Sequence, residues 1–253
     1  MKKYVILLLL VVGLCSAHAA TTAPDGESLN YRVMYKWGLV NKQAGTVNIR
    51  VKHNGKESFT SILTAKSERW ADKFYKVRDT LVGKISLATC EPTLYEKISH
   101  EGGEFKHDKI TYTRTGNKTK GHCLRLRRKK ADKPLTSNEI TLESAGLTLD
   151  MLSSFFYMRS IDFSKKPKGA TESMTVFSGK RKETLTITYK GIEVVKIDDK
   201  RYQTFHITFR FTGEGGKKTS DDMSAWITTT ANRIPVKLEG SLPVGKVQCF
   251  LIP

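Results

Sequence analysis

The feature that most constrains the fold of this chain is a repeated alternation of apolar and polar residues in short runs. Residues 31–35 and 47–51 both place aromatic or β-branched side chains at every second position, and Asn54-Gly55 follows the second run. An Asn-Gly pair between alternating runs is typical of a β-hairpin. Comparable runs separated by turn residues cover 59–65, 77–85, 94–99, 109–113, 122–126, 174–178, 184–189, 192–197, 205–211, 225–229, 235–238 and 246–251. This spacing predicts antiparallel meanders rather than alternating strands and helices.

One segment departs from the strand pattern. Met151, Phe155 and Met158 are spaced at i, i+4 and i+7, which is the period of a helix with one apolar face. Thr148 or Asp150 would cap its N-terminus.

The expected fold is therefore mainly all-β. We predict a strongly curved antiparallel sheet or open barrel of roughly a dozen strands with one central helix. Residues 20–253 are expected to form a single β-rich domain, with a short helical turn near 70–75. The basic and polar segment 127–138 is expected to be an exposed connection.

The beginning of the chain predicts export. Two lysines precede the apolar run 5–14, and Ala17 and Ala19 supply the small residues of a cleavage site. Residues 1–19 are expected to be a signal peptide cleaved near Ala19/Ala20, which predicts a periplasmic or exported protein. No later run approaches the length of a transmembrane helix, so no membrane span is expected in the mature chain.

Three cysteines, Cys90, Cys123 and Cys249, follow the predicted signal peptide. An exported compartment permits disulfides, but three cysteines allow at most one bridge, and its partners stay open. None of the three lies in a Cys-x-x-Cys pair, so neither metal nor redox chemistry is expected from them.

The chain is strongly basic, with 43 Lys+Arg against 25 Asp+Glu and a formal charge of +18. Export removes nucleic acid as an expected partner and favours a lipid, an acidic glycan or another outer-membrane component. The candidate polyanion-binding patch is the densest basic run, which comprises Arg125, Arg127, Arg128, Lys129 and Lys130. The alternative interpretation is a solvated strand end and loop.

No catalytic or metal site is predicted. His100, Glu101 and His107 lie within eight residues, and a hairpin turn could bring the two histidines together. However, the spacing matches no zinc signature, and a simple turn at Gly102-Gly103 is the preferred interpretation. The chain also contains none of the sequence patterns of common hydrolases. No cofactor is therefore expected.

Four residues are candidates for ligand binding. Arg78 and Asp79 lie inside a strand-like run, where charged residues are uncommon unless they are paired or face a pocket. Trp37 and Trp226 could form an aromatic floor for a sugar or lipid, although core packing is the alternative for Trp226.

Several segments together resemble one family of exported bacterial proteins. They are 35–40 (Tyr-Lys-Trp-Gly-Leu-Val), 44–46 (Ala-Gly-Thr), 75–79 (Tyr-Lys-Val-Arg-Asp), 150–159 (Asp-Met-Leu-Ser-Ser-Phe-Phe-Tyr-Met-Arg), 225–227 (Ala-Trp-Ile), 232–236 (Asn-Arg-Ile-Pro-Val) and 245–247 (Gly-Lys-Val). Their order resembles the pattern of the domain of unknown function 3108, over about residues 29–251. The resemblance implies an exported or periplasmic β-rich protein, and it implies no reaction, cofactor or ligand.

Three functions are consistent with the sequence. The preferred one is a non-enzymatic envelope protein whose curved sheet binds a lipid, glycan or other anionic envelope component. The second is a structural or assembly factor that docks on an outer-membrane partner. The third is a glycan-acting hydrolase that uses Asp79, Glu101, His100 or His107, and it requires two carboxylates, or a histidine and a nucleophile, in one cleft.

Overall fold

The computed structural model describes residues 22–253, in which fifteen strands form one sheet. The strands are β1 (Ser28–Trp37), β2 (Val40–Asn54), β3 (Ser58–Ser67), β4 (Val77–Ser86), β5 (Pro92–Glu101), β6 (Glu104–Thr115), β7 (Lys118–Arg128), β8 (Thr136–Ala145), β9 (Thr148–Leu149), β10 (Thr171–Phe177), β11 (Lys182–Ile197), β12 (Lys200–Thr212), β13 (Met223–Thr228), β14 (Pro235–Ser241) and β15 (Lys246–Ile252). Two α-helices, α1 (Arg69–Asp72) and α2 (Met151–Ser160), and two short 3-10 turns, Phe163–Lys165 and Glu214–Gly216, complete this part of the chain.

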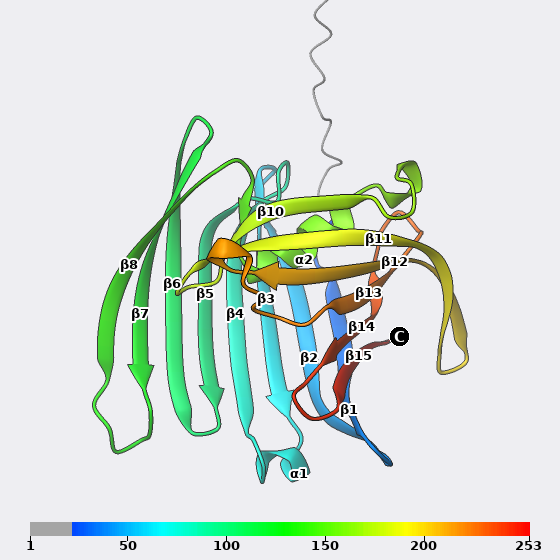
Figure 1. Ribbon diagram of the computed structural model, residues 1–253, viewed down its shortest axis with the longest axis horizontal. Helices are drawn as coiled ribbons and strands as arrows, with labels where there is room; N and C mark the ends of the chain where they lie inside the picture. The colour runs from blue at the N-terminus through cyan, green and yellow to red at the C-terminus, as the bar shows by residue number, and fades with distance from the viewer. Residues whose placement is uncertain (1–21) are drawn as a thin grey trace, which may run out of the picture.

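The sheet is rolled so that its two halves face each other. Strand β1 lies in the middle, paired with β2 on one side and with β15 on the other. From there one meander runs outward to β8 and another runs from β15 back to β10, with the short β9 pairing in parallel at the edge. In Figure 1, β2–β8 form one wall and β10–β12 cross in front of it. The predicted curved, barrel-like antiparallel sheet with a central helix is confirmed.

Strand β8 differs from the sequence-based expectation. The polar stretch at residues 136–138, predicted as an exposed connection, opens a strand that continues to Ala145 and pairs with β7. Ile140 and Leu142 alternate with polar residues, but β8 is an edge strand and most of its residues are exposed. Because the apolar content of an edge strand is low, its sequence resembles that of a loop.

Helix α2 fills the space between the two walls, where it contacts β4 on one side and β9 and β10 on the other. Phe156 is fully buried, and its ring lies 4.8 Å from that of Phe59 on β3. Gly83 on β4 leaves room for the Leu152 side chain. The predicted apolar face is wrong in detail, because Met151 is exposed while Ser153 and Ser154 are buried. A helix enclosed by sheet on several sides does not need a single apolar stripe.

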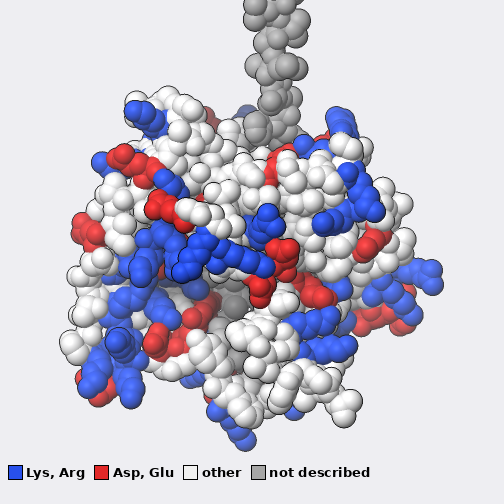
Figure 2. Space-filling model, in the orientation of Figure 1, with Lys and Arg blue, Asp and Glu red and all other residues white. Residues whose placement is uncertain are grey.

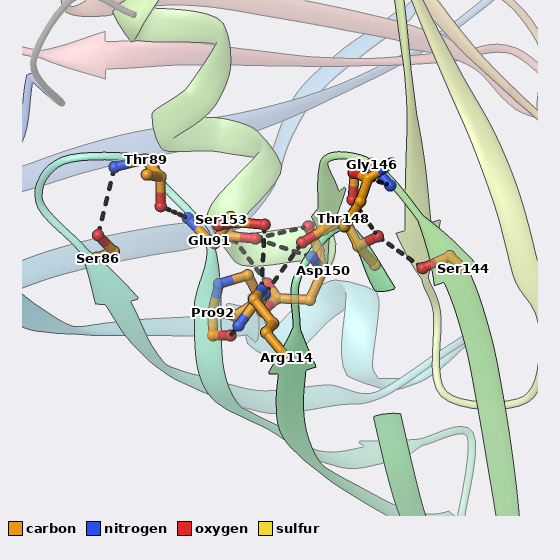
Figure 3. Close-up of polar contacts among 11 residues, drawn as sticks. Ser86, Thr89, Glu91, Pro92, Arg114, Ser144, Gly146, Thr148, Asp150 and Ser153 are labelled. Carbon is orange, nitrogen blue, oxygen red and sulfur yellow. Dashed lines mark hydrogen bonds and ion pairs between the residues drawn. The ribbon is translucent and has the colours of Figure 1, made fainter. Parts of the chain in front are cut away.

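Asp150 caps the N-terminus of α2 and is one of the two predicted caps. Its Oδ1 accepts hydrogen bonds from the backbone N–H groups of Leu152 and Ser153, and the Ser153 hydroxyl accepts one from the Asp150 N–H. Figure 3 shows Arg114 beside this cap, with its guanidinium donating to Glu91 and to the carbonyls of Pro92 and Thr148. Complete burial raises the pKa of Asp150 to about 7.

The last turn of α2 ties distant parts of the chain together. Arg159 is fully buried and makes two hydrogen bonds of 2.7 Å with the Glu27 carboxylate. The same guanidinium also donates to the carbonyls of Asn232 and Arg233. The first described residues, the helix and the β13–β14 connection are therefore joined at one point.

Other local predictions have clear outcomes. The Asn54-Gly55 hairpin joins β2 to β3, and α1 is the predicted helical turn. Cys123 and Cys249 form no disulfide with each other, and burial raises the pKa of each thiol to about 11. The predicted signal peptide lies outside the described residues. None of the helices described is long and apolar enough to span a membrane.

Candidate functional site: an apolar groove at one end of the sheet

An apolar groove of about 730 Å³ opens on the inner face of the sheet, at the end where α1 lies. Its walls come from β1–β4, α1 and β15, so strands from both ends of the sequence contribute. The residues around it are Val33, Tyr35, Trp37, Val40, Ala44, Gly45, Thr46, Val47, Ala65, Lys66, Ser67, Trp70, Ala71, Phe74, Tyr75, Val77, Leu242, Val247 and Cys249. The lining is almost wholly apolar.

The backbone of β2 bends where it borders the groove. The register between β1 and β2 shifts between Val33 and Met34, opposite Gly45. A side chain at Gly45 would lie 2.6 Å from the carbonyl oxygen of Lys66 on β3, so only glycine fits between these strands. Such bulges increase the twist of a sheet, and this one helps to curl its end around the groove.

Helix α1 forms one wall of the groove, and polar contacts fix it to the sheet. The Trp70 Nε1 donates to the Gln43 carbonyl over 2.7 Å. The Asp72 carboxylate accepts hydrogen bonds from Arg78, one of them 2.7 Å long, and from the Ser67 hydroxyl. These bonds from Arg78 and Ser67 lower the pKa of Asp72 to about 2. Arg78 thus positions the wall of the groove and lies on the opposite face of β4 from its interior.

A floor of paired charges lies directly beside the groove. Asp79 pairs across the strands with Ala65, a groove residue, and its carboxylate is 3.6 Å from the ammonium group of Lys97. Lys97 also lies 3.7 Å from Glu101, and Lys106 lies 3.7 Å from Glu101 and 2.8 Å from Glu104. Burial, with Glu101 next to it, raises the pKa of Asp79. Oδ1 of Asp79 is buried without a hydrogen-bond partner in the described part of the chain.

The predicted basic patch is divided by the structure. Arg125 and Arg127 lie in β7, not in a loop, and point to the inner face, where both bind Asp108. Arg128 is on the other face, with its guanidinium 5.7 Å from the centre of the Phe105 ring. The two exposed members, Lys129 and Lys130, follow the end of the strand. Because side chains alternate along a strand, consecutive basic residues cannot form one patch.

The candidates Trp37 and Trp226 occupy different places. Trp37 lies at the rim of the groove. Trp226 is buried against the His206 ring at 4.6 Å, and its Nε1 donates to Glu193 over 2.5 Å. The structure therefore brings Trp37 and Asp79 to the same region and places Trp226 elsewhere.

The hydrolase hypothesis requires its acidic groups and histidines to meet in one cleft. His100 and His107 lie on the opposite face of the sheet from Asp79 and Glu101, and His107 pairs with Glu96 over 2.7 Å. The Lys97 ammonium lies between the two inner carboxylates, where a hydrolase would need the glycosidic bond. The described residues contain no group of three metal-binding side chains.

Sequence reasoning does not find the groove residues on and after α1. It predicts only a short helical turn near 70–75, and it singles out neither Phe74 nor Tyr75 as a site residue. The available signal is the pair Phe74-Tyr75 between two lysines, an unusual composition for the end of a surface helical turn.

The fold and the groove define a class: a barrel-like β-protein with a central helix and an open apolar groove. The chain belongs to the protein family of unknown function DUF3108, whose model matches residues 30–251. The predicted family is therefore confirmed.

The solved structures that match the chain include the following two. One is a β-barrel-like protein with the domain of unknown function DUF1849 from Brucella abortus, at 12% identity and a TM-score of 0.63, covering 91% of this chain and 97% of that one. The other is a Bacteroides fragilis protein with a YmcC-like fold, at 7% identity and a TM-score of 0.38, covering 93% and 100% of the two chains. No curated protein matches the sequence. The first likeness concerns the fold alone.

Proposed function

We propose that the chain is an exported, non-enzymatic envelope protein that holds the hydrocarbon part of an amphipathic lipid in the apolar groove. The proposal of export rests on the sequence of residues 1–19. The proposal of a lipid ligand rests on one observation, an open groove of about 730 Å³ with an almost wholly apolar lining. Pockets for small molecules fall in this range of volume, and an apolar lining favours a ligand that gains by leaving water.

The neighbouring charges suit the polar end of such a ligand. Lys97 and Lys106 lie beside Asp79 and Glu101 on the same inner face as the groove. Figure 2 shows a hollow in this side of the molecule, with Lys and Arg side chains along one margin. We propose that the polar head group lies beside these paired charges while the hydrocarbon occupies the groove. A glycan fits the groove less well, because its hydroxyl groups would lose water without gaining hydrogen bonds.

The three tryptophans make this proposal testable by fluorescence. Trp37 and Trp70 line the groove, whereas Trp226 is buried in a separate cluster. The Trp226→Phe variant keeps only the groove tryptophans, and the Trp37→Phe/Trp70→Phe variant keeps only Trp226. Each is titrated with a fatty acid that carries bromine on its acyl chain, since bromine quenches tryptophan only at close range.

We expect saturable quenching in Trp226→Phe, reversed by an unbrominated fatty acid of the same length. The Trp37→Phe/Trp70→Phe variant should stay unquenched. Absence of quenching in both variants, or equal quenching in both, would contradict a lipid site in this groove. Mass spectrometry of a solvent extract of the purified protein would identify a natural ligand.

A further inference from the structure

Three connections of the chain end together around the mouth of the groove. They are the β1–β2 turn at residues 37–40, the segment 73–76 after α1, and the β14–β15 turn at 242–245. The Tyr35 hydroxyl donates to the Val244 carbonyl over 3.1 Å, and the backbone of Gly245 packs directly against Lys36. Figure 1 shows α1, the end of the β1–β2 hairpin and the β14–β15 connection at the same lower end of the molecule.

These connections carry large apolar side chains that are exposed. Leu39 is fully exposed and Phe74 is 82% exposed. We call the whole set the loop-tip surface; its residues are Trp37, Leu39, Val40, Phe74, Tyr75, Leu242 and Val244. Single exposed apolar residues are common, but seven on adjacent turns form an apolar patch of the kind that marks an interaction site.

Positive charge surrounds the loop-tip surface. Segments 36–42, 68–76 and 241–246 together contain six Lys or Arg and two acidic residues. Asp72 is paired with Arg78 and Lys246 with Glu239, while Glu68 accepts a hydrogen bond from Gln43. Lys36, Lys73 and Lys76 are exposed. In Figure 2, uncharged side chains dominate the lower part of the molecule, with Lys and Arg among and beside them.

We infer that the loop-tip surface docks on a lipid bilayer that contains anionic lipids. The apolar tips would enter the boundary between head groups and acyl chains, where Trp and Tyr are favoured. The lysines around them would face the lipid phosphates. A second copy of the chain is a poorer occupant, because it would bring the same positive charges into contact.

Docking in this orientation places the mouth of the groove against the membrane. Together with the proposed function, it would let a lipid pass between bilayer and groove without crossing water. The docking itself does not depend on a ligand in the groove, so the two proposals fail separately.

Two tip residues allow docking to be tested without altering the groove. Leu39 and Val244 belong to the loop-tip surface but do not line the groove. The test variant is Leu39→Asp/Val244→Asp. The matched control is Ile192→Asp/Val194→Asp, which changes two equally apolar, exposed residues on β11.

The experiment is sedimentation of the chain from residue 20 onward with vesicles of phosphatidylcholine, alone or mixed with phosphatidylglycerol. We expect the wild type and the β11 control to bind the mixed vesicles, and more weakly at high salt. The tip variant should partition at least about tenfold less. It should still show quenching by the brominated fatty acid, which separates docking from ligand binding.

No binding of the wild type to either vesicle would overturn the inference and leave a protein partner as the occupant. An equal loss of vesicle binding in the tip variant and in the β11 control would also overturn the inference, because the effect would then not be specific to the loop-tip surface. If the wild type binds the mixed vesicles but is not quenched by the brominated fatty acid, the docking stands and the proposed lipid site is contradicted.

Discussion

Replacing Asp150 by Asn should remove a large pH dependence from the stability of the fold. Asp150 is fully buried at the start of α2, and burial raises its pKa from 3.8 to about 7. Asn caps helices as well as Asp does, and its side-chain oxygen can accept the same N–H groups of Leu152 and Ser153. The substitution therefore keeps the cap and removes the titrating proton.

The sign and size of the effect follow from the two pKa values. Between about pH 4 and pH 7 the folded protein holds a proton that the unfolded chain has released, so raising the pH favours unfolding. A separation of about 3 pH units corresponds to a loss of about 4 kcal/mol across this window, and to no further loss above it. The Asp150→Asn variant carries no such penalty, because an amide does not titrate in this range.

The assay is urea unfolding, followed by tryptophan fluorescence, of wild type and Asp150→Asn from pH 4.5 to pH 8 (about one pH unit apart). The free energy of unfolding of the variant minus that of wild type should rise by about 3 kcal/mol over this range. Asp162→Asn is the control, because hydrogen bonding from Ser164 lowers the pKa of Asp162 and predicts no such gain. A difference that stays constant over this pH range, or a variant less stable than wild type at pH 8, would refute the reasoning.

Three further predictions concern the Arg159–Glu27 ion pair, the core and the groove wall. Arg159→Met should cost about 3–5 kcal/mol in urea unfolding, because it leaves the Glu27 carboxylate buried and unpaired; adding Glu27→Leu should recover part of the loss. Gly121→Ala should cost about 1–3 kcal/mol, since its new methyl group would lie 2.7 Å from the Phe177 ring, and an unchanged unfolding midpoint would contradict this packing. Arg78→Ala should weaken quenching by the brominated fatty acid by at most about fivefold, because it loosens α1 without removing a groove residue, and complete loss would contradict this limited role.

Much of the fold can be predicted because its signals are local. The alternation at residues 31–35 and the Asn54-Gly55 turn each specify a strand or hairpin from a few neighbouring residues. The helix is also recognisable from its spacing, although its enclosure by both walls is not. Strand β8 escapes prediction because an edge strand with exposed sides carries little apolar alternation.

The groove could not be predicted, because it depends on pairing between the two ends of the sequence. Val33 lies opposite Cys249, a register that no local pattern specifies. The sequence could identify Asp79 as unusual but not the side from which Lys97 approaches it. It also could not separate Arg125, which faces the interior, from Lys130, which is exposed after the strand.

Six of the seven segments that carry the family resemblance fall into two parts of the structure. Segments 150–159 and 232–236 meet at Arg159 and close the rolled sheet. Segments 35–40, 44–46, 75–79 and 245–247 border the groove. A shared fold accounts for the first group, because those residues cap the helix and satisfy buried charges.

Folding alone accounts less well for the second group. Leu39 gains no burial from the fold, and Trp37 and Tyr75 stay 57% and 54% exposed, so much of their apolar surface adds nothing to stability. Contact with a membrane, as inferred above, gives these exposed side chains a role. We therefore expect the function of this chain to depend on the groove and its mouth, rather than on the basic run of β7. A survey of other family members by vesicle sedimentation should then find the same salt-sensitive binding, and members that fold without binding vesicles would argue that docking is particular to this chain.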